Sequence, residues 1–255
     1  MTLLYDTQSL LQRYVTKLYR NPTLLGTNLF TPLFFLLLFS QLLGKFSVFL
    51  PSSSGGYLAY LTPGVVLLNA MISAPLGGVS IANDLNSGFL SKMLMTQVAR
   101  PAILLGRLLT DVSVVMAQSV ITIIVAIALG VHVFYGLPGI LLMLLTTAFF
   151  ELALSGIFLT IGIRTRKTET ISAISGVLFF PLIFVSSAMF PVSFFPAWAQ
   201  TASSYNPVSY AANVTREMVL GGFSYSTLVS AYALIGAIAI VAFMATWYQF
   251  RKVVS

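Results

Sequence analysis

Two long apolar stretches joined by a polar interruption decide the fold, and over residues 60–130 they read YLTPGVVLLNAMISAPLGGVSIANDLNSGFLSKMLMTQVARPAILLGRLLTDVSVVMAQSVITIIVAIALG. Each apolar stretch is near or above the roughly 20 residues that a helix needs to cross a bilayer. The interruption, residues 83–101, is neither rich in Gly and Ser like a linker nor free of hydrophobic residues like a plain loop. The pattern therefore predicts two membrane helices with a structured connection.

The composition of the whole chain is that of a membrane protein. Of its 255 residues, 58% are hydrophobic and 7% are charged, against roughly a quarter charged in a soluble domain. The net charge of +7 comes from basic residues that stand singly or in small groups between apolar runs, which disfavours a nucleic-acid surface. The chain has no Cys and a single His, His132, so thiol chemistry and paired-His metal sites are excluded.

Six apolar segments are long enough to cross a bilayer, at 22–43, 57–82, 102–130, 137–163, 170–190 and 227–250. With the N-terminus in the cytoplasm, eleven of the 13 Lys and Arg residues lie on the cytoplasmic side, and only Lys45 and Arg216 lie outside. The eleven are Arg13, Lys17, Arg20, Lys92, Arg100, Arg107, Arg164, Arg166, Lys167, Arg251 and Lys252. The sequence therefore predicts an all-α membrane protein, a single domain over 1–255 with six transmembrane helices and both termini cytoplasmic.

Two further segments flank these spans. Residues 1–21 place Leu4, Leu11 and Leu18 at helical spacing with basic residues between them, which predicts an amphipathic helix lying in the membrane interface. Residues 191–226 hold two short, moderately apolar stretches, with a helix start at Asn206-Pro207 and a stop at Gly221-Gly222. We expect a helical hairpin that re-enters the outer leaflet, with an ordinary extracellular loop as the alternative.

The chain carries no sequence for binding nucleotide by itself. Its only Gly-Lys pair is Gly44-Lys45, and the residue five positions before that Gly is Phe39, so no Walker A loop exists. One acidic residue lies near mid-membrane and no internal repeat is seen, which disfavours an ion-coupled carrier. The cytoplasmic interruption is therefore where energy from a partner would enter.

Residues 84–100 are expected to form a short cytoplasmic helix that presses into a groove on a soluble partner. Asp84, followed by Asn86 and Ser87, would cap it, and Arg100-Pro101 would close it. Phe89 and Met93 give an apolar stripe, while Lys92 supplies polar character. A merely interfacial helix is the alternative, because periodicity alone does not separate the two.

Few polar residues lie inside the predicted spans. Glu151 falls about 21 Å along its helix, near mid-membrane, where an ionisable group suggests function. We take Glu151, Gln118 and Asn69 as candidates for a substrate path; Glu151 could attract cationic cargo, pair with Gln118, or be protonated and packed. Arg107 and Asp111, four apart near the cytoplasmic face, predict an ion pair.

Small residues gather on one face of the second predicted span. They are Ala70, Ser73, Ala74, Gly77 and Gly78. Such a face predicts close helix packing, either within the chain or between two copies.

Residues 60–130 resemble the membrane subunit of ABC-2 type exporters. In that family an acidic residue and a glycine open the cytoplasmic helix, an Arg closes it and a Gly-Arg leads the next span; here these are Asp84, Gly88, Arg100 and Gly106-Arg107. The outer segment is similar to the family's hairpin, with its Pro-Trp, Asn-Pro, Arg and Leu-Gly-Gly, at Trp198, Asn206, Pro207, Arg216 and Leu220. Asp84 replaces a more usual Glu, and TQVARP replaces a common Thr-Pro pair.

The resemblance implies a dimer of permease subunits working with a pair of ABC ATPase subunits, which would bind ATP and magnesium. It implies that the chain itself is not an enzyme and that residues 84–100 dock on the ATPase through Asp84, Gly88, Phe89, Lys92, Met93 and Arg100. In length and style the chain is similar to daunorubicin-resistance exporter permeases, which implies export of a small amphipathic or lipid-like molecule across a bacterial plasma membrane by alternating access. Export of a lipid-linked glycan is the alternative, and an intramembrane enzyme or a membrane scaffold is the alternative of another class.

Overall fold

The computed structural model describes residues 22–42, 56–95 and 100–254, together with Gln12, Thr16 and Gly44. These residues form helices and turns, and no strand occurs among them. The expected interfacial helix at 1–21 lies outside this set, apart from Gln12 and Thr16, which are helical.

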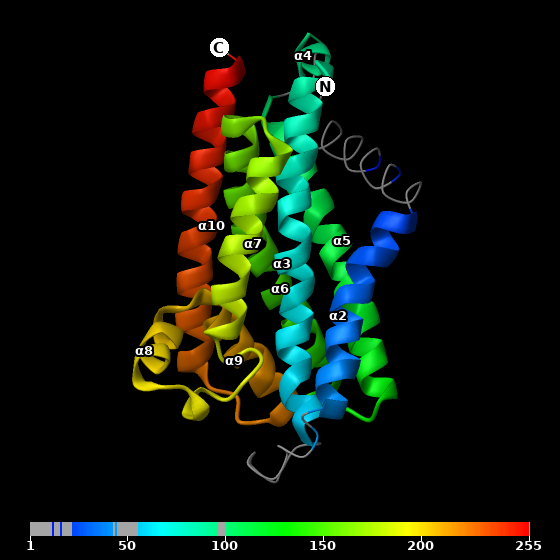
Figure 1. Ribbon diagram of the computed structural model, residues 1–255, viewed down its shortest axis with the longest axis vertical. Coiled ribbons are helices and arrows are strands. Elements are labelled where there is room, and N and C mark those ends of the chain that lie inside the picture. The colour runs from blue at the N-terminus through cyan, green and yellow to red at the C-terminus, as the bar shows by residue number, and fades with distance from the viewer. Residues whose placement is uncertain are drawn as a thin grey trace.

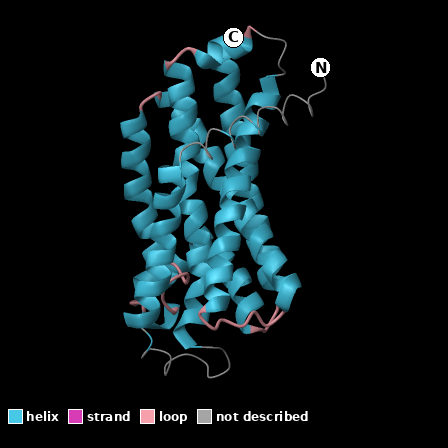
Figure 2. Ribbon diagram, turned by 90° about the vertical axis from the view of Figure 1, so that its right-hand side faces the viewer, coloured by secondary structure: helices cyan, strands magenta, loops and turns pink. Residues whose placement is uncertain are grey.

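Long helices run side by side through the molecule (Figure 1). The elements are α2 (Pro22–Leu42), α3 (Gly56–Asn86), α4 (Phe89–Leu94), α5 (Arg100–Ala128), α6 (Gly136–Thr165), α7 (Thr168–Phe184), the 3₁₀ turn η2 (Val192–Phe194), α8 (Ala197–Tyr205), α9 (Pro207–Leu220) and α10 (Tyr225–Val254). The end that carries α4 also holds the C-terminal end of α10, whereas α8 and α9 lie at the opposite end. Most turns gather at these two ends (Figure 2).

Among the described residues, four helices are long and apolar enough to cross a membrane: Gly56–Asn86, Pro101–Ala128, Gly136–Thr165 and Tyr225–Lys252. The described part of the chain is therefore all-helical, and the length and composition of its helices fit a membrane protein. Two further apolar helices are shorter, Asn28–Leu42 within α2 and Thr168–Phe184. With 17 residues, α7 extends about 25 Å, less than the roughly 30 Å of a hydrocarbon core.

The segment 170–190 is predicted as helix throughout, but α7 ends at Phe184. The next residues turn, and side chains from other helices take up their carbonyl groups: the Tyr60 hydroxyl donates to the Ser187 carbonyl and the Tyr57 hydroxyl to the Met189 carbonyl. The helix can end inside the protein because these backbone groups find partners there.

The core is built on α3, which packs against α2, α5, α6, α7 and α9. Its small-residue face is buried within the chain, so this face serves packing between helices of one molecule. At the crossing of α3 and α6, a methyl group on Gly78 would meet the Phe158 carbonyl, and one on Gly162 would meet the Gly78 carbonyl. The two backbones touch there because neither position carries a side chain.

The cytoplasmic connection differs from the single helix expected over 84–100. Asp84 lies in the last turn of α3 and does not cap a second helix. Gly88 ends α3: its φ is +68°, which favours glycine, and its amide donates to the Leu85 carbonyl at 3.2 Å. The helix that follows, α4, has 6 residues, and Arg100 begins α5; residues 96–99 lie outside the described set.

The glycine contact between α3 and α6 predicts an asymmetric effect of adding one methyl group. Gly162→Ala should lower stability by about 1–3 kcal/mol, because the new Cβ overlaps backbone of α3. Gly236→Ala on α10 is the matched control, since a Cβ there meets nothing within 4 Å, and it should be neutral or slightly stabilising. Thermal unfolding of the purified variants measures both; equal midpoints would contradict the close packing.

Candidate functional site

The short helix α4 is attached to the end of the bundle by one face. Leu90 and Met93 are buried and belong to a hydrophobic cluster that includes Ile103 of α5, Leu159 of α6 and Phe250 of α10. Helix α4 packs against the end of α3, and its buried residues share one hydrophobic cluster with residues of α5, α6 and α10.

The opposite face of α4 is open. Lys92 is exposed and the side chain of Met95, just beyond the helix, is 89% exposed, while Phe89 is half-buried. Of the predicted contact residues, Lys92 is available to a partner, whereas Met93 faces inward. Met95 was missed, although its place three residues after Lys92 puts both on one helical face.

The neighbours of α4 are anchored as well. Asp84 is buried in the last turn of α3. The Asn86 side-chain amide donates to the Arg166 carbonyl at 2.8 Å, which ties the end of α3 to the turn between α6 and α7. Helix α6 is capped at its end by Arg166, which has a φ of 55° and whose backbone amide donates to the Gly162 carbonyl.

A chain of polar side chains is buried below α4, and we call it the inner polar cluster: Ser80, Arg107, Asp111, Glu151 and Ser155. Arg107 Nη2 lies 2.9 Å from Asp111 Oδ1, and Arg107 Nη1 donates to Ser80 Oγ at 2.9 Å. Ser155 Oγ lies 3.2 Å from Asp111 Oδ2 and 2.9 Å from Glu151 Oε1. The cluster thus joins α3, α5 and α6.

A glycine makes room for this cluster. A Cβ on Gly77 of α3 would meet the Asp111 carboxylate and come close to Ser155. Because Gly77 has no side chain, the carboxylate of α5 can reach the hydroxyl of α6 across the face of α3.

A second group lies farther from α4, and we call it the outer polar cluster: Asn69, Gln118 and Thr122. Asn69 Nδ2 donates to Thr122 Oγ1 at 3.1 Å, and the Thr122 hydroxyl donates to the Gln118 carbonyl at 2.9 Å. Both amide atoms of the Gln118 side chain are buried with no hydrogen-bond partner among the described residues.

Glu151 does not pair with Gln118, which was one of the three alternatives that the sequence left open. Its Oε1 contacts Ser155, one turn away on the same helix, and no hydrogen bond joins it to Gln118. Gln118 lies seven residues beyond Asp111 on α5, about 10 Å of helical rise, so the two predicted partners fall at different depths. The three proposed path residues, Glu151, Gln118 and Asn69, are all buried between α3, α5 and α6.

The end of the bundle opposite α4 holds the residues of the predicted hairpin. Asn206 caps α9: its Oδ1 accepts from the Val208 amide at 2.9 Å, and Pro207 is the first helical residue. Asn206 Nδ2 also donates to the Leu182 and Val185 carbonyls, at 2.8 and 3.1 Å, so one side chain joins α9 to the end of α7. Trp198 on α8 is 69% exposed.

Arg216 is the centre of a contact network that sequence reasoning missed. Its guanidinium carbon lies 3.8 Å from the centroid of the Tyr60 ring, and its Nη1 donates to Asn213 Oδ1 at 3.1 Å. Its Nη2 donates to the carbonyls of Ser187 and Ala188. Tyr60 and Arg216 stand more than 150 positions apart in the chain, so no local pattern joins them.

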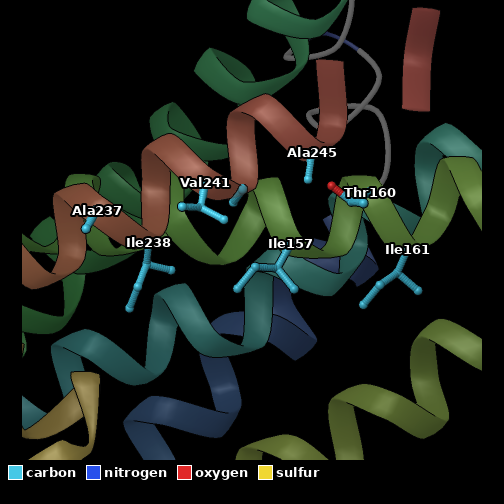
Figure 3. Close-up of a pocket in the computed structure, with 8 residues that line it drawn as sticks. Ile157, Thr160, Ile161, Ala237, Ile238, Val241 and Ala245 are labelled. Carbon is cyan, nitrogen blue, oxygen red and sulfur yellow. The ribbon is translucent and has the colours of Figure 1, made fainter. Parts of the chain in front are cut away.

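An apolar groove of about 430 Å³ lies between α6 and α10 (Figure 3). Its lining is aliphatic apart from Thr160, whose hydroxyl is already hydrogen-bonded to the Gly156 carbonyl and to Thr246. The groove therefore offers no polar group that would select a ligand. Within the described residues there is also no group of three or more His, Asp or Glu side chains that could hold a metal ion.

A bundle of apolar helices with a short helix packed across one end defines a multi-pass membrane protein. The model of the ABC-2 type transporter family matches residues 5–220. The chain belongs to this family.

Named relatives carry permease descriptions. The chain is 29% identical over 190 residues to the daunorubicin resistance ABC transporter permease protein DrrB1 of Streptomyces coeruleorubidus, covering 74% of this chain and 66% of that protein. It is 22% identical over 240 residues to the probable doxorubicin resistance ABC transporter permease protein DrrC of Mycobacterium tuberculosis. The matched residues cover 93% of this chain and 86% of that protein. It is 26% identical over 220 residues to the putative transport permease ycf38 of Pyropia yezoensis. The matched residues cover 84% of this chain and 74% of that protein.

The buried amide of Gln118 predicts an unusual response to a polar-to-apolar change. Gln118→Leu should leave the thermal midpoint unchanged or raise it, because a buried amide without partners is replaced by an apolar group of similar size. Asn69→Leu should lower the midpoint, since it removes the hydrogen bond to Thr122. A Gln118→Leu protein that is clearly less stable than the wild type would show that the amide has a partner.

Proposed function

We propose that this chain is the membrane-spanning permease subunit of an ATP-driven exporter that moves a small amphipathic or lipid-like molecule out of the cytoplasm by alternating access. The observation that carries the proposal is the family match over residues 5–220, together with relatives described as daunorubicin and doxorubicin resistance permeases. The cargo class follows from those descriptions.

We propose six spans, formed by α2, α3, α5, α6, α7 and α10, with both termini in the cytoplasm of a bacterial cell and the chain in its plasma membrane. Basic residues support this orientation, because Lys92, Arg166 and Arg251 belong to segments that meet at the α4 end of the bundle. At the other end α9 has 14 residues, too few to span, which supports an outer hairpin that re-enters the membrane.

We propose that α4 is the docking site for a separate ABC ATPase subunit, where ATP and magnesium would bind. A docking element needs an open face for the partner and a fixed attachment to the spans, and α4 has both: Lys92 and Met95 are exposed, while Leu90 and Met93 are buried. The absence of a Walker A sequence from the chain supports an energy source on another subunit.

We propose that a second copy packs against α7. Only Ile171 and Ile183 of this helix are buried, and its exposed side includes the small residues Ser172 and Gly176. Small and weakly polar residues favour contact between helices in a membrane over contact with lipid. A dimer would cover the α7 surface that one chain leaves open.

The exposed face of α4 predicts where complex formation is lost. The double variant Lys92→Glu, Met95→Glu should fail to co-purify with an ABC ATPase encoded beside this chain. The first change reverses the positive charge of Lys92, and the second puts a negative charge in place of the apolar Met95 side chain. ATP-dependent daunorubicin uptake by inverted vesicles should be lost with it. Arg251→Glu, at the same end but on α10, is the charge-reversal control and should retain both.

Two outcomes would contradict parts of this proposal. An intact complex in the double variant would place the docking site away from α4. A complex that forms normally but transports a lipid-linked oligosaccharide and not daunorubicin would replace the cargo class while keeping the transport function.

The exposed small residues of α7 predict a cross-link between two copies. The chain has no native Cys, so Gly176→Cys supplies a single thiol, in a place where a Cβ meets nothing within 4 Å. Oxidation in membranes should give a disulfide-linked dimer on a non-reducing gel. Ile240→Cys, on the exposed side of α10, is the control and should remain monomeric; the reverse pattern would move the interface to α10.

A further inference from the structure

The inner polar cluster contains two carboxyl groups and one cation. Asp111 is paired with Arg107 at 2.9 Å, whereas Glu151 is 0% exposed and touches only the Ser155 hydroxyl through Oε1. Its second oxygen, Oε2, is buried with no hydrogen-bond partner among the described residues. The second carboxyl group therefore has no counter-charge of its own.

If both carboxyl groups are ionised, the cluster has too few hydrogen atoms to make a hydrogen bond at each of the two contacts of Ser155. A serine hydroxyl has one hydrogen to donate, yet Ser155 Oγ lies within hydrogen-bond distance of Asp111 Oδ2 and of Glu151 Oε1. With two carboxylates, one of these contacts would join two acceptors and would be repulsive. An ionised carboxylate with no paired cation in this interior also costs several kcal/mol.

One added proton resolves both problems. If Glu151 carries it on Oε1, that group donates to Ser155 Oγ, the Ser155 hydroxyl donates to Asp111 Oδ2, and Asp111 accepts from Arg107. Every contact then joins a donor to an acceptor. The charge of Arg107 balances that of Asp111, and Glu151 is neutral.

We propose that the inner polar cluster is a proton-binding site, in which the Glu151 and Asp111 carboxyl groups hold one proton between them through Ser155 while α3, α5 and α6 are packed together. Among the described residues, the ionisable groups that act on Glu151 are Asp111 and Arg107, both from α5. The member from α3 is Ser80, which does not ionise. The site goes beyond the proposed transport function and does not depend on the cargo or on an ATPase.

The bound proton makes helix packing depend on pH. Glu151 can ionise only where water or another cation reaches it, which requires α3, α5 and α6 to separate. The packed arrangement therefore binds one more proton than the separated one, so its stability is full at low pH and falls as pH rises through the range in which the site gives up its proton.

Infrared spectroscopy of the full-length chain in lipid membranes tests the site directly. At neutral pH the wild type should show the carbonyl stretching band of a protonated carboxylic acid, and Glu151→Gln should lack it. Asp111→Asn should lack it too, because Glu151 is then the one carboxyl group of the cluster, and it ionises as the counter-charge of Arg107. Glu217→Gln is the control and should keep the band, since Glu217 lies in the outer hairpin, where its Oε2 accepts from the Ser224 amide.

Each alternative result overturns the proposal in a definite way. No such band in the wild type, or a band that survives Glu151→Gln, excludes a proton on Glu151. A band that survives Asp111→Asn shows that Glu151 holds its proton without Asp111, so the pair is not shared.

Two further measurements cover the case in which Asp111→Asn does not fold. Ser155→Ala keeps both carboxyl groups and should shift the band, because the hydroxyl that accepts from Glu151 is gone; an unshifted band excludes the link through Ser155. Thermal unfolding of the wild type should weaken as pH rises, while Glu151→Gln should lose this dependence. Parallel curves for the two proteins would overturn the link between proton and packing.

Discussion

The contact between Gly78 of α3 and Gly162 of α6 sets the distances in the rest of the bundle. Neither position leaves room for a Cβ, so the two helix backbones approach more closely than side chains would allow. At the preceding residue, Gly77 leaves space for the Asp111 carboxylate beside Ser155. The inner polar cluster exists because small residues on α3 bring α5 and α6 within hydrogen-bond distance. Larger residues would separate the helices and break the contacts of Ser155 with Asp111 and of Arg107 with Ser80, whereas the Arg107–Asp111 pair lies within α5 and would remain.

A second constraint acts at the end of the bundle that holds α8 and α9, where α7 stops after 17 residues, about 25 Å of helix. Backbone carbonyls exposed there need donors, since lipid supplies none. Asn206, Tyr60 and Arg216 donate to the carbonyls between Leu182 and Ala188. These donors come from α3 and from the start and middle of α9, so the turn after α7 is held by both of its neighbours. The hairpin and the early end of α7 are thus parts of one arrangement.

How much could be predicted from the sequence follows from the range of each interaction. The apolar stretches predict the helices because the backbone hydrogen bonds of a helix form within the stretch, and its length can be read directly from the sequence. The Arg107–Asp111 pair and the Asn206 cap are also local. The inward direction of Met93 is different, because it depends on the end of α10, more than 150 residues away. The same holds for Arg216 and Tyr60.

One local feature was nevertheless misjudged. Gly88 stands between two helical patterns and is compatible with one helix over 84–100 or with a break. In the structure its φ is positive, and the helix breaks there. The Glu151–Ser155 contact has the same four-residue spacing as Arg107–Asp111 and was within reach of the sequence.

The positions of α4 and the inner polar cluster together constrain how a push from an ATPase would travel through the chain. Helix α4 connects α3 to α5, and Arg107, in the second turn of α5, donates to Ser80 and to the Leu76 carbonyl on α3. The two helices on either side of α4 are therefore joined again within a short distance of it and would move as a pair. Movement of that pair relative to α6 has to break the contact between Ser155 and Asp111, which is the polar link from α5 to α6 among the described members of this cluster. The contact between Ser155 and Glu151 lies within α6 and would be kept. Separation of α6 from the pair would thus take Asp111 away from Glu151, so the two carboxyl groups could no longer share the proposed proton.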